Sequence, residues 1–126
     1  MKTLKIGIAS YKAMKARTLA IAKGEKKPRR GEPKIWFTSM ESFSKLLSDR
    51  NRALLRLIVE TQPESLAELA DLSGRAKSNL SRTLHNMEKY GLVHLEKKAG
   101  GKIVPRVPYE DIVLDVSIKP QEPIGV

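Results

Sequence analysis

Residues 65–108 carry the pattern that most constrains this fold, because two short helices, a glycine turn and a glycine-tipped strand pair follow one another without a gap. Ser65 and Glu68 have the spacing of a capping box, in which each side chain satisfies a free backbone N–H at the start of a helix. Apolar residues then favour a helix over 66–72, and Gly74 permits a tight turn after it.

A second helix is predicted over about residues 75–89, and Gly91 would end it. Its buried stripe would be Ala76, Leu80, Leu84 and Met87, at helical spacing. The opposite face is then Arg75, Ser78, Asn79, Arg82 and His85, with Lys77 and Ser81 on its flank. No acidic residue occurs from Gly74 to Met87, whereas surface helices usually mix acids and bases.

The next segment reads as a β-hairpin. Two β-prone runs, 92–98 and 102–108, flank Ala99-Gly100-Gly101, and paired glycines supply the positive φ that tight hairpin turns need. Pro105 and Pro108 confine the second strand to an edge. Helix, turn, helix and hairpin in this order predict a winged helix-turn-helix.

The flanking segments extend this prediction to an α+β fold. Strands are expected over residues 3–9 and 35–37, with a helix over 11–23 between them, which makes an N-terminal β-α-β appendage. A C-terminal strand is expected over 112–118, with Ile112, Leu114, Val116 and Ile118 on a buried face. We expect the three strands to share one sheet, with the helix covering one side.

Two further helices are expected before residue 63. The first starts at Thr38 or Ser39, and Asp49 would cap the second, which Pro63 ends. The predicted organisation is an N-terminal module over 1–38 for packing or dimerisation, a DNA-binding winged helix over 39–109, and a C-terminal strand with a loose tail over 110–126.

The charge distribution indicates the kind of partner. The chain has a formal net charge of +10, of which residues 1–34 contribute +9, from eleven Lys and Arg against two acids. Such an excess favours a polyanion, and nucleic acid before an anionic membrane. The predicted basic arm, Lys26, Lys27, Arg29 and Arg30, would touch the DNA backbone or the minor groove.

The acid-free helix face is explained if the second helix enters the major groove of DNA. Phosphates would repel acidic side chains there, whereas Arg82 can bond guanine and Asn79 can bond adenine bidentately. Lys77 and Ser81 are better placed for phosphate contacts. The hairpin would add basic wing residues, namely Lys97, Lys98, Lys102 and Arg106.

Other classes of function find little support in the sequence. There is no cysteine, so disulfides and thiolate metal sites are excluded, and a reducing cytoplasm is the expected location. No HExxH, phosphate loop, nucleophile elbow or carboxylate cluster appears, so we expect no enzyme, cofactor or metal. No apolar run approaches the roughly 20 residues of a membrane span, and the N-terminus does not read as a signal peptide.

A wider resemblance rests on KARTLAIAKGE, EPKIWFTSMES, RNRALLRLI, GRAKSNLSRTLHNMEKYGLV and VPRVPYEDI. These segments resemble a family of DNA-binding, MarR-like winged-helix transcriptional regulators of bacteria and archaea. The resemblance covers roughly residues 2–118. It implies recognition-helix roles for Arg75, Lys77, Ser78, Asn79 and Arg82, and an antitoxin-like role beside a small toxin for some members.

Three functions follow as hypotheses. The first is a dimeric, sequence-specific binder of double-stranded DNA that represses transcription by blocking polymerase. The second is an antitoxin that binds a toxin protein and its own promoter. The third is a non-specific nucleic-acid-binding protein, which the scarcity of aromatic residues on the basic helix face disfavours.

Overall fold

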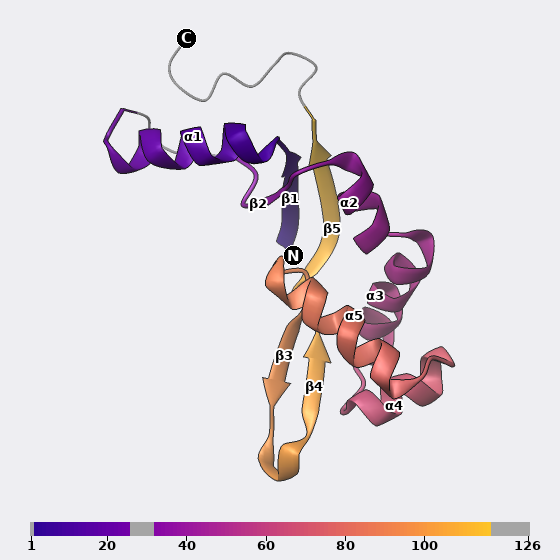
Figure 1. Ribbon diagram of the computed structural model, residues 1–126. Helices are drawn as coiled ribbons and strands as arrows, with labels where there is room; N and C mark the ends of the chain where they lie inside the picture. The colour runs from indigo at the N-terminus through magenta and orange to yellow at the C-terminus, as the bar shows by residue number, and fades with distance from the viewer. Residues whose placement is uncertain (1, 26–31, 117–126) are drawn as a thin grey trace. The chain divides into compact units, whose positions relative to one another are not determined.

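The computed structural model describes residues 2–25 and 32–116 (Figure 1). The predicted basic arm of Lys26, Lys27, Arg29 and Arg30 lies outside these residues, as does Ile118. The described residues divide into two units. The winged-helix unit comprises residues 2–3 and Ser44–Asp111, and the sheet unit comprises residues 4–25, 32–43 and 112–116.

A three-stranded sheet with the order β2-β1-β5 organises the sheet unit, which confirms the predicted sharing of strands. β1 (Lys2–Ile8) and β2 (Ile35–Phe37) pair in parallel, with Gly7 opposite Trp36, and β5 (Tyr109–Asp115) forms the other edge. The connection between the parallel strands contains α1 (Tyr11–Ala22), as parallel pairing requires a long crossover. Leu4, Ile6 and Phe37 are buried. The rings of Phe37 and Phe43 pack edge to face, with 5.5 Å between their centroids.

Helix α1 begins as the sequence predicts but buries little. The Ser10 hydroxyl accepts a hydrogen bond from the Ala13 N–H at 3.1 Å, which caps the helix. Ala20 is its one buried residue. The Arg17 guanidinium lies 5.6 Å from the centroid of the Trp36 ring and also pairs with Glu32, so Arg17 ties α1 to the segment that contains β2.

The side chains of β5 are more exposed than the sequence predicts. Its expected buried face is largely open, because Ile112 is 37% exposed, Val116 is 47% exposed and Leu114 is half-buried. Val113, on the other side, is 44% exposed. Alternation assigns side chains to the two faces of a strand, but their burial depends on what packs on each face. β5 lies at the edge of its sheet, where fewer neighbours cover its side chains.

Gly7 is required by its neighbour on β2. A Cβ atom at position 7 would lie 2.5 Å from Cζ3 of Trp36, far inside van der Waals contact. We expect Gly7→Ala to lower the free energy of unfolding by about 1–2 kcal/mol, because the Trp36 ring must shift from its place against residue 7. In a Trp36→Ala background the same change should cost almost nothing in urea denaturation. Equal losses in both backgrounds would contradict this contact.

The helices that follow β2 differ from the predictions mainly at their starts. α2 (Met40–Leu46) follows Ser39, whose hydroxyl accepts from the Ser42 N–H at 3.1 Å. α3 (Asp49–Thr61) is capped by Ser48, which accepts from the Asn51 N–H at 3.2 Å, and not by Asp49 as predicted. The Asp49 carboxylate instead pairs with Arg52 one turn along the helix.

The helix-turn-helix consists of α4 (Leu66–Ser73) and α5 (Lys77–Lys89), joined by a turn in which Gly74 has φ 72°. The predicted cap is present, since Ser65 accepts from the Glu68 N–H at 3.0 Å, although the Glu68 carboxylate accepts from the N–H of Glu64. The helix α5 begins at Lys77 rather than near residue 75. Ala76 is therefore an extended, exposed N-cap and not part of the buried stripe.

The core of the winged-helix unit forms around α5. Leu80, Leu84 and Met87 are completely buried, so three of the four predicted stripe residues are confirmed. The other apolar residues buried in the winged-helix unit include Leu47, Leu54, Leu55, Ile58, Pro63, Leu66, Leu69, Leu92, Val93, Val104 and Pro105. Since this stripe fixes the rotation of α5, it also decides which side chains point away from the core.

The wing is an antiparallel hairpin of β3 (His94–Lys97) and β4 (Ile103–Arg106). A 3-10 turn, Ala99–Gly101, joins the strands, and Gly100 and Gly101 have φ of 80° and 77°. Both values lie in the left-handed region that favours glycine, so the hairpin prediction is confirmed at its turn. Together with the sheet, the structure has the predicted α+β fold with a winged helix-turn-helix.

Candidate nucleic-acid interface

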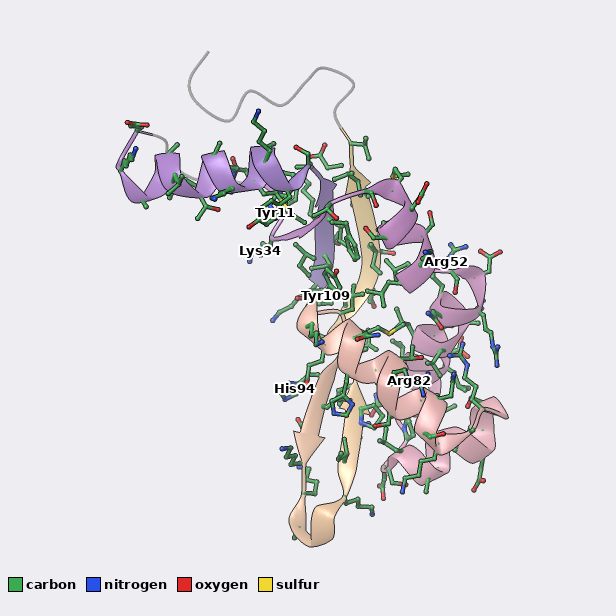
Figure 2. The ribbon with its side chains drawn as sticks, viewed as in Figure 1. Tyr11, Lys34, Arg52, Arg82, His94 and Tyr109 are labelled. Carbon is green, nitrogen blue, oxygen red and sulfur yellow. The ribbon has the colours of Figure 1, made fainter. Side chains whose placement is uncertain are left out.

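Helix α5 presents a polar face opposite its buried stripe. Lys77, Ser78, Asn79, Arg82 and His85 are exposed there, and Ser81 is half-buried. Figure 2 shows Arg82 projecting from α5. Since no acid lies between Gly74 and Met87, these side chains form a continuous surface of donors, amides and positive charge.

His85 is partly fixed on this face. Its Nδ1 lies 2.6 Å from the carbonyl oxygen of Ser81, one turn earlier. A carbonyl oxygen can only accept, so Nδ1 carries the proton in this arrangement. The Nε2 atom of a neutral His85 is then an acceptor, and it becomes a donor when the ring is protonated.

The first turn of α5 is open to an external acceptor. Its N-cap is Ala76, which has no side-chain oxygen to satisfy the first backbone N–H groups of the helix. Lys77 places a positive charge at the same end. An anion such as a DNA phosphate would satisfy both features.

Arg75 departs from its predicted position. It lies in the turn before α5, is only 9% exposed, and its Nη2 donates to the carbonyl oxygen of Arg50 at 2.9 Å. Burial, and secondarily the charge of Arg50, hold the pKa of Arg75 below its ordinary value. Arg75 is therefore not part of the exposed face of α5, because the helix begins two residues later than the sequence indicated.

The wing residues fall into two groups. Lys97, Lys98 and Lys102 are exposed near the turn, where Lys98 pairs with Glu96 at 3.3 Å. Arg106 lies instead at the base of β4 and donates through Nη1 to the carbonyl oxygens of Pro63 at 2.7 Å and Pro105 at 2.8 Å. It anchors β4 to the loop between α3 and α4, so it does not belong to the exposed cations near the wing turn.

A second anchor, which the sequence did not reveal, comes from Glu88. Its carboxylate accepts a hydrogen bond from the Leu95 N–H at 3.0 Å, which joins the end of α5 to β3. The available signal was that Glu88 is the first acid after the acid-free stretch. Glu88 therefore joins the wing to α5, and Arg106 joins the wing to the loop between α3 and α4.

We expect Glu88→Ala to loosen the wing. The Leu95 N–H should exchange with solvent roughly 2–10-fold faster, as expected for loss of one hydrogen bond of about 0.5–1.5 kcal/mol. Glu96→Ala is the matched control. It removes a carboxylate from β3, the strand that contains Leu95, and this carboxylate pairs with Lys98 rather than with the Leu95 N–H. Identical exchange of Leu95 in both variants and the unaltered protein would contradict the proposed anchor.

A hollow of about 430 Å³ lies between the start of α4, the start of α5 and the wing turn. Ser65, Lys77 and Lys102 contribute to its lining, together with the backbone of Gly100 and Gly101. Two lysines at one concave surface favour an anionic ligand over a neutral one. The hollow therefore brings Lys77 of α5 and Lys102 of the wing to one concave surface.

No group of three or more His, Cys, Asp or Glu side chains that could hold a metal ion occurs in residues 2–25 and 32–116. Over the same residues, no helix is both long enough and apolar enough to cross a membrane.

Comparisons with known proteins give a family and one solved structure. The family model HVO_A0114 matches residues 46–114, more than half of the chain. A crystal structure described as the predicted DNA-binding transcriptional regulator from E. coli is similar to this chain at 20% identity and a TM-score of 0.47. The match covers 75% of this chain and 84% of that one. No curated protein matches the chain.

Proposed function

The chain belongs to the HVO_A0114 family, and we propose that it is a sequence-specific regulator that binds double-stranded DNA through α5 and the wing. One observation carries the proposal, namely the exposed, acid-free face of α5 that a fully buried stripe directs away from the core. An α-helix fits the major groove, whose base edges offer acceptors to Arg82 and both donors and acceptors to Asn79.

The remaining cations support binding to the backbone. Lys77 and the open first turn of α5 can hold one phosphate, and Lys97, Lys98 and Lys102 can contact the backbone or the minor groove beyond the wing. The hydrogen bonds of Glu88 and Arg106 hold the wing against the end of α5 and the loop between α3 and α4. A rigid pair of contact surfaces favours one register on the duplex.

We also propose that the protein acts as a dimer and represses transcription by occupying its site. One recognition helix buries too little surface for tight, specific binding, and two-fold related helices can read two half-sites. The edge strand β5 exposes Ile112 and Val113, and α1 exposes Tyr11 and Leu19. Exposed apolar side chains along an unpaired sheet edge are suited to pairing with a second copy.

Selection of bound duplexes from a random pool tests the proposal. A palindrome whose half-sites lie about 10 base pairs apart is expected, because each recognition helix would meet one major groove. Sedimentation of the free protein should give twice the chain mass of 14.1 kDa. Recovery of unrelated sequences with affinity that depends only on salt would instead indicate non-specific binding.

A further inference from the structure

Two arginines from different helical segments meet beside the start of α5. Arg50 lies in the first turn of α3, and Arg75 lies in the turn before α5. The Arg75 guanidinium donates to the Arg50 carbonyl oxygen at 2.9 Å, which fixes the two residues next to each other. Within residues 2–25 and 32–116, neither guanidinium pairs with a carboxylate.

This arrangement is electrostatically unfavourable for the protein alone. The two positive charges repel each other, and a cation in the first turn of a helix opposes the helix dipole. Asp49 lies in the same turn and offsets part of the dipole cost, but its carboxylate pairs with Arg52 and with neither of these two guanidinium groups. A bound anion between the two guanidinium groups would offset each of these costs.

The buried arginine can still reach a ligand. Apart from Nη2, the guanidinium nitrogens of Arg75 make no hydrogen bond to the residues that the structure describes. No buried side-chain nitrogen or oxygen in the described residues lacks a partner, so these nitrogens must retain contact with solvent. The bond to Arg50 holds the guanidinium in place, which lowers the entropic cost of binding an anion.

We propose that Arg50 and Arg75 form a binding site for one backbone phosphate of the DNA duplex, beside the groove that α5 enters. This inference rests on the proposed function and adds a contact that the outward face of α5 does not provide. Guanidinium groups bind phosphate oxygens through paired N–H donors, and such contacts position a protein without reading sequence.

Neighbouring arginines on α3 provide the test. Arg50→Gln removes the exposed member of the site, whereas Arg52→Gln removes an arginine of the same helical turn that is already paired with Asp49. Duplex affinity is measured by fluorescence anisotropy on the selected sequence and on unrelated sequences, between about 50 and 200 mM salt. Arg50→Gln should lower affinity roughly 3–10-fold for all sequences alike and reduce the slope of log K against log salt by about 0.9. Arg52→Gln should leave the slope nearly unchanged.

A direct reading comes from the side-chain N–H resonances of Arg75. They should shift when the duplex is added to the unaltered protein, and this shift should shrink in Arg50→Gln. If the unaltered protein selects a duplex but Arg50→Gln and Arg52→Gln give the same slope, the phosphate site is wrong and the proposed function stands. If the unaltered protein binds no duplex, the proposed function fails as well.

Discussion

Replacing Arg82 or Asn79 by alanine is expected to weaken binding to the selected duplex by about 1–3 kcal/mol and to relax the preference at one base position. Both side chains are exposed on the face of α5 opposite the buried stripe, so truncation removes contacts with DNA and leaves the core intact. The measurement is anisotropy with a panel of duplexes, each changed at one base pair of the selected site.

Arg56→Ala is the matched control for Arg82→Ala. Arg56 is an arginine on α3 that pairs with Glu60 at 2.9 Å, and its side chain is 81% exposed. Its loss removes the same charge from the protein but should leave the base preference unchanged. If Asn79→Ala and Arg82→Ala also leave the preference unchanged, α5 does not read bases in the way proposed here.

Leu84→Ala is expected to lower the free energy of unfolding by about 2–5 kcal/mol. Leu84 is completely buried in the middle of α5, and its removal would leave a cavity where α5 packs on α4 and β3. Urea denaturation followed by circular dichroism should show a lower midpoint with an unchanged slope, because the surface exposed on unfolding hardly changes.

Leu72→Ala is the matched control for Leu84→Ala, because it removes the same leucine side chain from an exposed position. Leu72 lies on α4 and is 47% exposed, so its truncation should change the free energy of unfolding by only about 0.5 kcal/mol. Equal destabilisation by the two substitutions would mean that Leu84 is not in the core. The rotation of α5, and with it the outward face, would then be different from that described here.

The helix-turn-helix and the wing could be predicted from the sequence because their signals are local. The Ser65 cap, the left-handed glycines and the spacing of Leu80, Leu84 and Met87 act over a few residues, and each is present in the structure. The same stripe fixed which side chains of α5 face outward. The prediction was wrong where two neighbouring residues competed for one role, as with Ser48 and Asp49 at the start of α3.

The contacts between residues far apart in the chain could be seen only in the tertiary structure. The periodicity of α5 extended its predicted outward face back to Arg75, yet Arg75 is buried against Arg50, 25 positions earlier. Arg106 reads as a wing cation, but the Pro63 carbonyl, 43 positions away, holds it at the base of the wing. Alternation in β5 likewise could not show that its apolar residues stay exposed. Sequence patterns thus determine the helices and their faces, whereas the partner that each charge or face contacts is decided by packing between distant segments.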